Sequence, residues 1–536
     1  MFSLLRPFGL QTLLATSSLT VAQNLTVADP AAACNALGQS LALENVTVNF
    51  AEYLPAGTNL SFSQDYNLST CGSVSQVVPV DLCRVAMYVA TTNRSGISLE
   101  GWLPTNWTGR FLMTGNGGLS GCISYEDVAY ATSFGFATFG QNNGHNGTRG
   151  YAFYQNSDVV EDFVYRGLYT GTVIGKQITN TYYTQSLSTS FYLGCSTGGR
   201  QGWKMIQDYP DVFDGVVVGA PALFFPGLTS WSGIFYTILG NSSSDTFVSA
   251  DLWAAVNNEI MNQCDGIDGA MDGIIEDTLL CNFRPEAMQC APGVTNSTTC
   301  LTSAQVGAVR QVFTDYYGLD GLLVYPKMQP GSELLARYIY YGGTAFQYTA
   351  DWFRYVVYED PSWDPASFTR ADTKAAIDQN PFNALTWNGD ISAFQKHGGK
   401  VLHWHGEADY IITSDNSPRY YNHVSQTMGL PSSELDDFYR FFRVSGTGHC
   451  QGGAGAHMIG QQATESAATD PQNNILARII TWVEDGNAPE TITGTKYVND
   501  DATQGVAFVR NHCKYPLRNV YTGPANYTQP EAWTCI

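Results

Sequence analysis

The sequence has few charged residues, and basic residues are the scarcest of them. Only 14% of its 536 residues are charged, and 47 acids against 26 lysines and arginines leave a formal net charge of −21. A field of this sign repels nucleic acid and anionic lipid, so neither is expected as a partner. Long apolar runs are also lacking. Beyond the N-terminus no stretch approaches 18 uninterrupted apolar residues, which argues against a membrane span.

Internal repeats and low-complexity tracts are likewise lacking, and disorder is not indicated. The chain is 44% apolar and 13% aromatic, with 31 tyrosines and 27 phenylalanines, whereas disordered chains are depleted in aromatic residues. Its 536 residues are enough for two cores of roughly 100–200 residues each, or for one large domain with an insertion.

The first 22 residues have the pattern of a secretory signal peptide. Arg6 precedes a mostly apolar middle, and the segment ends in small residues at positions 20–22, which predicts cleavage near Ala22. A partly buried N-terminal helix is the alternative.

Acceptor sequences for N-glycans and an even number of cysteines point to the same compartment. Ten N-x-[ST] sequences in one chain, after a signal peptide, favour a glycosylated exported protein. Twelve cysteines fit six disulfides formed in an oxidising compartment. We therefore predict a secreted, extracellular glycoprotein. The acceptor asparagines are Asn24, Asn45, Asn59, Asn67, Asn93, Asn106, Asn146, Asn241, Asn296 and Asn526.

Apolar segments in the first half of the chain predict strands that alternate with helices. Short apolar segments bounded by glycine and asparagine are typical of strands, and longer segments with helical periodicity lie between them. This alternation indicates an α/β fold, with a mainly parallel sheet and helices on both faces. The expected strands are 111–114, 136–139, 190–193 and 216–218, and the expected helices are 159–183 and 200–208.

The pattern changes from about residue 222 to residue 384. Four cysteines lie between positions 264 and 300, and aromatic residues cluster without clear alternation. A strand at 400–404 and a helix at 474–483 then resume the α/β pattern. We predict an α/β domain interrupted by a disulfide-rich lid. Its parts are a signal peptide (1–22), the first part of the catalytic domain (23–221), the lid (222–384) and the second part of the catalytic domain (385–536).

Ser196 lies in a G-x-S-x-G motif, between an expected strand and an expected helix. Gly194 and Gly198 permit a turn too tight for a Cβ atom, which would lift the serine off the end of the strand. The helix N-terminus beneath it supplies unpaired N–H groups and partial positive charge where an oxyanion would form. Strand and helix together favour a nucleophile over a simple glycine-rich turn.

A serine nucleophile needs an imidazole base, and the chain has eight histidines. His449 differs from the others because Cys450 follows it directly, just as Cys195 directly precedes Ser196. If these cysteines are bonded, their Cα atoms lie about 5.5 Å apart and the adjacent side chains come within reach of a hydrogen bond. Other cysteine pairings remain open at this point.

The imidazole needs a carboxylate, which the chain order of α/β-hydrolases places between Ser196 and His449, after a late strand. Residues 403–410 fit, because a strand and a glycine turn precede two acids. Asp409 and Glu407 are the candidates and Asp415 is a weaker one, and the family resemblance described next weighs heavily in favour of Asp409.

These motifs resemble the fungal tannase/feruloyl esterase family, most closely the type-B feruloyl esterases. The likeness runs from about residue 30 to the C-terminus. The resemblance implies an α/β-hydrolase fold and a triad of Ser196, Asp409 and His449, with Cys195 bonded to Cys450. The motifs that carry it are 109–122 (GRFLMTGNGGLSGC), 195–202 (CSTGGRQG), 215–221 (GVVVGAP), His405-Gly406 with Asp409, and His449-Cys450.

The same resemblance implies how the remaining cysteines pair. The pairs are Cys34–Cys83, Cys71–Cys122, Cys264–Cys281, Cys290–Cys300 and Cys513–Cys535.

Two places supply candidate donors to an oxyanion. The backbone N–H of Thr197, next after the nucleophile, is the default first donor. The glycine-rich loop after the strand at 111–114 offers Gly117 or Gly118 as the second, and the sequence does not choose between them.

Three aspartates and several glycines form a candidate calcium loop in the lid. Asp265, Asp268 and Asp272 lie within eight residues, and a hard cation that accepts oxygen ligands would offset their mutual repulsion. The related esterases imply that the carbonyls of Ala270 and Ile274 complete the site, with a structural role for the Ca²⁺. A solvated acidic turn is the alternative, and no organic cofactor is expected.

We therefore expect a secreted serine esterase that releases hydroxycinnamic acids such as ferulate, p-coumarate or caffeate, the acyl groups that the resemblance implies. The esters would be plant cell-wall esters or small ones, with a role in xylan and other polysaccharide degradation. A tannase acting on galloyl esters and a non-catalytic glycan-binding protein on a hydrolase scaffold are the alternatives. The lid aromatics are expected to cover a planar phenolic ring, which favours apolar walls with a few polar anchors.

Overall fold

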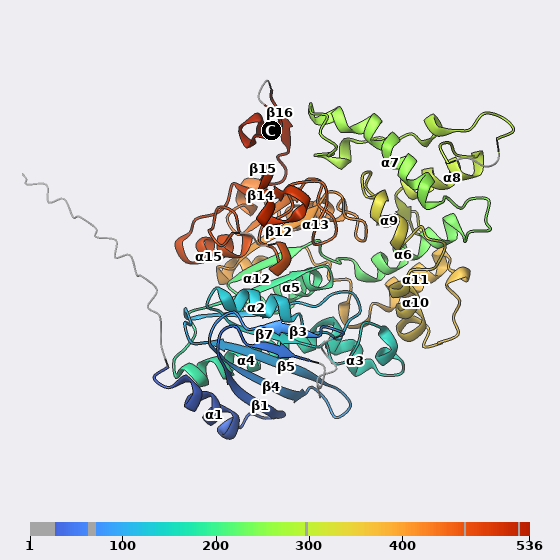
Figure 1. Ribbon diagram of the computed structural model, residues 1–536. Helices are drawn as coiled ribbons and strands as arrows, with labels where there is room; N and C mark the ends of the chain where they lie inside the picture. The colour runs from blue at the N-terminus through green and yellow to red at the C-terminus, as the bar shows by residue number, and fades with distance from the viewer. Residues whose placement is uncertain (1–26, 63–70, 295–297, 466–467, 524–525) are drawn as a thin grey trace, which may run out of the picture.

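The computed structural model describes residues 27–62, 71–294, 298–465, 468–523 and 526–536 (Figure 1). The predicted signal peptide (1–22) and the acceptor asparagines Asn24, Asn67 and Asn296 lie outside these residues. No helix in the described ranges is both long and apolar enough to cross a bilayer.

A nine-stranded sheet forms the centre of the fold, in the order β1-β4-β5-β7-β6-β8-β9-β12-β13. The strands from β7 to β13 are parallel, whereas β1, β4, β5 and β7 pair antiparallel. The parallel half confirms the predicted α/β class. In sheet order the bounds are β1 Val46–Leu54, β4 Leu82–Ala90, β5 Gly96–Pro104, β7 Ala137–Gln141, β6 Arg110–Thr114, β8 Thr189–Cys195, β9 Gly215–Gly219, β12 Lys400–Gly406 and β13 Tyr439–Val444.

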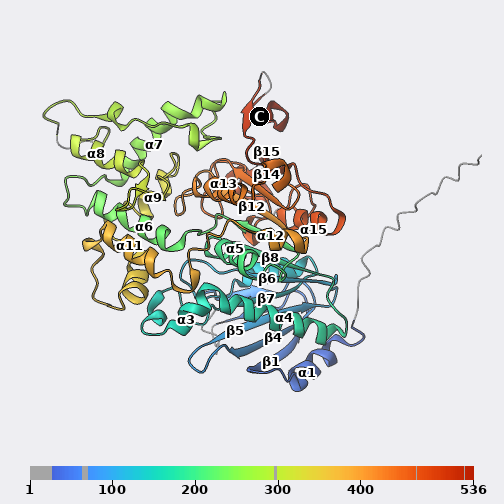
Figure 2. The ribbon, with the colours of Figure 1, turned by 180° about the vertical axis from the view of Figure 1, so that it is seen from behind.

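Helices cover both faces of this sheet, because successive strand residues point to opposite sides. Tyr192 and Val216 face one core with α4 (Gly167–Tyr183), α5 (Thr197–Asp208) and α13 (Asn416–Met428). Leu193 and Val217 face the other core with α15 (Ile475–Asp485), whose sequence supplies an apolar stripe. Figure 2 shows α4 lying across the sheet, on the side opposite α2 (Tyr125–Ser133).

Most expected elements form where the sequence places them. The helical pattern at 159–183 becomes α3 (Ser157–Glu161), a π-helical turn (Asp162–Arg166) and α4. The helix expected from residue 200 begins earlier, at Thr197, so that it starts directly after the candidate nucleophile.

The chain between β9 and β12 forms a helical body beside the sheet, green to yellow in Figure 1. Its core is rich in aromatic side chains, among them Trp253 stacked on Tyr341 with ring centroids 4.3 Å apart. This body occupies the predicted lid segment; the domain boundaries themselves remain predictions. Its elements are α6 Phe225–Leu239, α7 Ala250–Cys264, α8 Ser303–Val312, β10 Tyr316–Tyr317, β11 Leu323–Tyr325, α9 Glu333–Ile339, α10 Gln347–Trp352 and α11 Arg370–Gln379.

Short elements complete the described chain. Two hairpins lie near the C-terminus, β14 with β15 and β16 with β17. The remaining elements are α1 Pro30–Ser40, β2 Asn59–Ser61, β3 Ser75–Val77, α12 Ser392–His397, α14 Ser432–Leu435, β14 Thr491–Tyr497, β15 Val506–Cys513, β16 Asn519–Tyr521 and β17 Trp533–Cys535.

Six disulfides join all twelve cysteines. They are the pairs that the family resemblance implies: Cys34–Cys83, Cys71–Cys122, Cys195–Cys450, Cys264–Cys281, Cys290–Cys300 and Cys513–Cys535.

Candidate active site

Ser196 lies on a sharp turn between β8 and α5. Its backbone has φ 63° and ψ −123°, a strained conformation for a residue with a side chain. The neighbouring glycines make the turn possible, because a Cβ atom added at Gly194 would lie 2.9 Å from the backbone of Gly198. The Ser196 N–H donates to the Gly219 carbonyl over 2.9 Å, which ties the turn to β9. The hydroxyl therefore stands at the carboxyl end of the sheet, above the N-terminus of α5.

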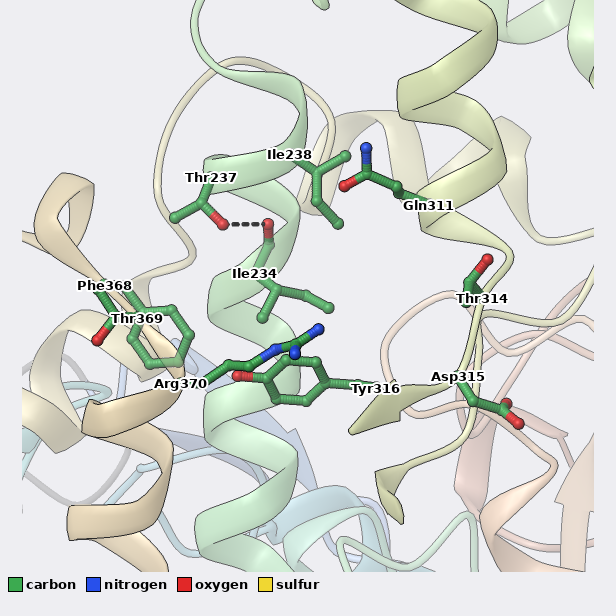
Figure 3. A pocket seen from close by; sticks show the side chains of 10 residues that line it. All are labelled: Ile234, Thr237, Ile238, Gln311, Thr314, Asp315, Tyr316, Phe368, Thr369 and Arg370. Atoms are coloured by element: carbon green, nitrogen blue, oxygen red, sulfur yellow. Dashed lines mark hydrogen bonds between the residues drawn. The ribbon is translucent and has the colours of Figure 1, made fainter. Parts of the chain in front are cut away.

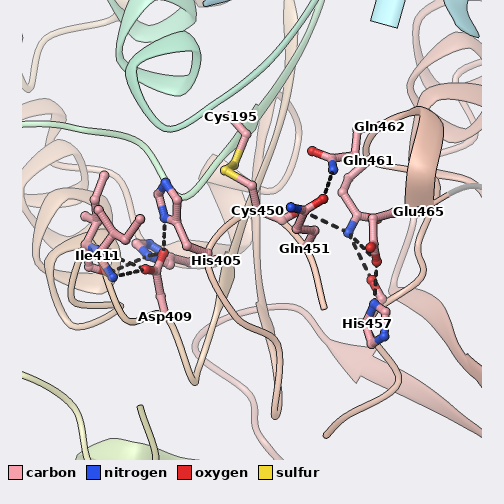
Figure 4. Close-up of a disulfide and its surroundings, with 12 residues drawn as sticks. Cys195, His405, Asp409, Ile411, Cys450, Gln451, His457, Gln461, Gln462 and Glu465 are labelled. Carbon is pink, nitrogen blue, oxygen red and sulfur yellow. Dashed lines mark hydrogen bonds and ion pairs between the residues drawn. A yellow bond between two sulfur atoms is a disulfide. The ribbon is translucent and has the colours of Figure 1, made fainter. Parts of the chain in front are cut away.

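The Cys195–Cys450 disulfide brings the loop after β13 to this turn (Figure 4). Its Cα atoms lie 6.0 Å apart, and Ser196 and His449 line one cavity. The described contacts include no hydrogen bond between the Ser196 hydroxyl and His449. Such contacts are often long in free hydrolases and shorten when substrate binds.

Asp409 lies on the loop after β12 and holds His449. Nδ1 of His449 donates to Oδ2 of Asp409 over 2.8 Å, and the carboxylate is fully buried. The other oxygen, Oδ1, accepts the N–H groups of Ile411 and Ile412 at 2.8 and 2.9 Å. Burial by itself would raise the pKa of Asp409, but His449 and His405 outweigh it and hold the pKa well below its usual range. Asp409 is therefore an anion that fixes the imidazole orientation.

The rival acids point elsewhere in the described structure. Oε2 of Glu407 accepts the Thr278 hydroxyl over 2.9 Å, and burial raises the pKa of Glu407. Burial also raises the pKa of Asp415, to about 7. Neither carboxyl group forms a hydrogen bond with His449 among the described contacts, so Asp409 is the acid that the fold brings to this histidine.

The loop after β6 lies against the nucleophile turn. Oγ1 of Thr197 donates to the Gly118 carbonyl over 2.8 Å, and Gly118 has φ +55°. Among the hydrogen bonds of the described residues, none engages the N–H groups of Thr197, Gly117 or Gly118. The structure keeps both glycines at the cavity and does not select one of them.

Buried amide side chains hold this loop in place, and although Asn116 and Gln201 lie in the family motifs, the sequence did not predict their contacts. Gln201 accepts the Asn116 N–H over 3.0 Å, and its own amide donates to the Asn116 side chain over 3.1 Å. The Asn116 side chain in turn donates to the carbonyls of Cys122 and Gln141 at 2.7 and 2.6 Å. Because these groups are buried and mutually satisfied, they fix the loop rigidly.

Two cavities meet at Ser196. The larger, of about 470 Å³, is open and carries polar side chains, among them Ser124, Asp127 and Gln462. The smaller, of about 30 Å³, is mainly apolar, and most of its wall comes from the lid. Its apolar and aromatic lining side chains are Leu119, Ala222, Phe225, Leu228, Tyr340, Phe346, Tyr348, Ile411 and Ile412.

Another cavity, of about 270 Å³, lies within the lid (Figure 3). Side chains of α6 and α8 line it together with Phe368 and Arg370. It contains none of the predicted site residues.

The candidate calcium loop is folded around its own carboxylates. Asp265 Oδ1 accepts the N–H groups of Gly273 and Ile274, and Asp268 Oδ1 accepts that of Ala270 over 2.8 Å. Burial raises the pKa of Asp268 to about 7. Arg510 donates to Asp272 over 3.0 Å. Among the described residues no three histidine, cysteine, aspartate or glutamate side chains are grouped to hold a metal ion.

The acceptor asparagines for N-glycans that the structure describes are all exposed. They are Asn45, Asn59, Asn93, Asn106, Asn146, Asn241 and Asn526.

Ser196, on a strained strand–helix turn, and His449 line one cavity, and the buried Asp409 carboxylate holds His449. This arrangement at the carboxyl end of a mainly parallel sheet defines the α/β-hydrolase class. Comparison with known proteins agrees. Residues 83–536 match the family described as "Tannase and feruloyl esterase". The chain therefore belongs to the tannase and feruloyl esterase family and is a carboxylic ester hydrolase.

Relatives from Aspergillus are similar over nearly the whole chain. A probable feruloyl esterase B-2 of Aspergillus oryzae is 54% identical over 503 residues, 94% of this chain and 95% of the relative. The crystal structure of feruloyl esterase B from the same fungus is 50% identical with a TM-score of 0.92, and the match covers 95% of this chain and 100% of that one. The tannin acyl hydrolase of Aspergillus niger shares the fold at 22% identity, with a TM-score of 0.75 and coverage of 95% and 96%.

Proposed function

We propose that this protein is a feruloyl esterase in which Ser196, His449 and Asp409 form the catalytic triad. His449 takes the Ser196 proton as Oγ attacks the ester carbonyl, and Asp409 holds the imidazole in the required tautomer. The oxyanion accepts hydrogen bonds from the N–H of Thr197 and from Gly117 or Gly118. The observation that carries this proposal is the buried Asp409–His449 hydrogen bond at the cavity that Ser196 lines.

The second half of the reaction uses the same groups. His449 returns its proton to the alcohol oxygen, the alcohol leaves, and an acyl group remains on Ser196 Oγ. A water molecule then loses its proton to His449 and attacks the acyl carbon. Ser196 regains a proton from His449, and the carboxylic acid is released. This cycle requires no organic cofactor.

The walls of the two cavities match the two halves of a hydroxycinnamoyl ester in their chemistry. The apolar and aromatic wall of the smaller cavity suits a planar phenolic ring such as that of ferulate, p-coumarate or caffeate, and at about 30 Å³ this cavity has to widen to take the ring. The larger, polar and open cavity suits a sugar of a plant wall polysaccharide or a small alcohol. The 50–54% identity to proteins named feruloyl esterase B supports this choice of acyl group. A role in degrading xylan and related polysaccharides follows from it.

A comparison of the hydrolysis rates of methyl ferulate and methyl gallate tests which acyl group the enzyme prefers. We expect kcat/KM for ferulate to exceed that for gallate by at least about tenfold, because a largely apolar pocket leaves the extra galloyl hydroxyls unpaired. Ser196→Ala should abolish both activities without lowering the melting temperature. A preference for gallate would identify a tannase, and the absence of turnover of either ester would favour a non-catalytic glycan-binding protein.

Secretion and N-glycosylation complete the proposal. The signal-like segment at 1–22, the six disulfides and the exposed acceptor asparagines all support an extracellular glycoprotein. The protein collected from culture medium should begin near Gln23 and lose mass on treatment with a peptide N-glycosidase.

A structural calcium ion in the lid loop is also part of the proposal. Carboxylates of Asp265, Asp268 and Asp272 and the carbonyls of Ala270 and Ile274 are the hard oxygen donors that Ca²⁺ prefers. Asp265 and Asp272 both accept the Ile274 N–H, which brings these two carboxylates close together. The ion would neutralise the loop, and Cys264–Cys281 would close it.

A further inference from the structure

A chain of buried hydrogen bonds begins at Asp409 and leads away from His449. His405 Nε2 lies 3.1 Å from Asp409 Oδ2, and its Nδ1 lies 2.6 Å from the Ser417 hydroxyl. Ser417 Oγ lies 2.8 Å from Nε2 of His403, whose Nδ1 lies 2.9 Å from the Tyr439 hydroxyl. All five side chains are at most 1% exposed. None of the last four belongs to the triad.

Three neighbouring elements carry the side chains of this hydrogen-bond series. His403 and His405 lie two positions apart on β12, so both side chains point to the same face of the sheet. Tyr439 begins the adjacent parallel strand β13, and Ser417 lies in the first turn of α13. Figure 4 shows His405 beside Asp409 at the disulfide.

With a neutral His405 ring, the partners set the direction of every hydrogen bond. Nε2 of His405 faces two groups that only accept, the Asp409 carboxylate and the Ile412 carbonyl at 3.1 Å, so this nitrogen carries the proton. In the neutral ring Nδ1 then accepts, and the Ser417 hydroxyl donates to it. Ser417 Oγ is left to accept from Nε2 of His403.

The hydrogen bond at the far end of this series, between Tyr439 and His403, has the same direction. Burial lowers the pKa of His403 well below its usual value, so that this ring is neutral. With its proton on Nε2, its Nδ1 accepts, and Tyr439 donates. All four hydrogen bonds therefore point toward Asp409.

The Asp409 carboxylate consequently receives four donors. Oδ1 accepts the N–H groups of Ile411 and Ile412, and Oδ2 accepts those of His449 and His405. This set satisfies the roughly four acceptor sites of a carboxylate. A fully satisfied carboxylate has one orientation available, and that orientation places Oδ2 on His449.

We propose that His405 is a positioning residue for Asp409, and that Tyr439, His403 and Ser417 form a buried relay that fixes the tautomer of His405. The proposal rests on the esterase mechanism above. A neutral His405 is required, because His449 becomes a cation during turnover and one buried carboxylate balances a single positive charge.

Two substitutions that differ by one methylene group test the two ring nitrogens of His405 separately. The side-chain amide of His405→Gln reaches the position of Nε2 and can still donate to Asp409, whereas that of His405→Asn reaches the position of Nδ1 and meets only Ser417. We expect kcat to fall about 100-fold in the Asn variant, because the carboxylate loses its alignment. The kcat of the Gln variant should be at least about tenfold higher than that of the Asn variant. The KM of both variants should stay within about twofold of the wild-type value.

Relay variants and a matched control complete the test. Ser417→Ala should lower kcat by about tenfold and Tyr439→Phe by less, because the relay acts through His405. Tyr183→Phe is the control: its buried hydroxyl donates to the Pro104 carbonyl over 2.7 Å, away from the site, so kcat should not change. Melting temperatures are measured for every variant.

The outcomes distinguish this proposal from the proposed function. If the wild-type protein neither turns over methyl ferulate nor reacts with a fluorophosphonate at Ser196, the esterase mechanism itself fails. If the wild-type protein is active and the Gln and Asn variants lose activity in equal measure and in parallel with melting temperature, His405 has only a structural role and the positioning proposal is overturned.

Discussion

Cys195 and Cys450 are bonded across 255 positions, and each is the immediate neighbour of a residue that lines the larger cavity at Ser196. Cys195 precedes Ser196, and Cys450 follows His449. Ser196 and Cys450 both have positive φ angles, 63° and 62°, which persist only where the surroundings hold them. The crosslink therefore holds two strained turns against each other, next to the proposed nucleophile and base.

Removal of this crosslink should cost activity and stability together. For a Cys195→Ala/Cys450→Ala double variant we expect kcat to fall about 100-fold as the two turns move apart, and the free energy of unfolding to fall by about 2–4 kcal/mol. The control is the double variant Cys34→Ala/Cys83→Ala, because that disulfide joins α1 to β4. The control should lose stability and keep its kcat; equal losses of kcat in both variants would contradict the proposed role.

The Thr197 hydroxyl is expected to matter for the oxyanion loop. Thr197→Val keeps the backbone N–H and the shape of the side chain but removes the hydrogen bond to the Gly118 carbonyl. We expect kcat to fall by about tenfold, less than the 10²–10³-fold lost with an oxyanion donor itself. Thr197→Ser retains the hydroxyl and should stay near the wild-type value. A valine variant as active as the serine variant would show that the loop does not depend on this hydrogen bond.

His457 should make stability depend on pH. Burial would lower its pKa, but its contacts with Glu465 and Asp500 prevail and raise the pKa. A raised pKa means that the folded state favours the imidazolium. The stabilisation that His457 contributes is therefore fully present below pH 6.5 and is lost as pH rises through the folded pKa.

The matching experiment compares melting temperatures across this pH range. His457→Gln should lower the melting temperature by about 1–3 °C at pH 5.5, and the difference from wild type should shrink by pH 8.5. His397→Gln serves as the control, because it removes a histidine–carboxylate contact, with Asp214, that is far more exposed. A difference that grows with pH would contradict the assigned sign.

Calcium removal should destabilise the lid. A chelator should lower the melting temperature, because an ion at 100 times its Kd stabilises the folded state by about 2.7 kcal/mol. Asp268→Asn and Asp272→Asn should be insensitive to the chelator, whereas Asp360→Asn, at an exposed lid carboxylate, should respond like wild type. An unchanged wild-type melting curve would refute the calcium site.

Much of the site could be predicted from the sequence, because its local parts are encoded locally. The glycines around Ser196, the apolar strand before it and the helix after it specify the turn without help from distant residues. The adjacency of Cys450 to His449 then pointed to the base. The antiparallel strands β1, β4 and β5 at one end of the sheet were not predicted, because β4 and β5 are buried on both faces and alternate little between polar and apolar residues.

The sequence by itself determined the α/β class, the nucleophile turn and an even set of cysteines. Only the tertiary structure decided that Asp409, and not Glu407 two residues earlier, meets His449. It alone also decided that a series of hydrogen bonds leads to that carboxylate, through Tyr439, His403, Ser417 and His405. The physical reason is that turn geometry and periodicity depend on neighbours along the chain. The partner of a buried polar group depends instead on how segments tens or hundreds of residues apart pack together.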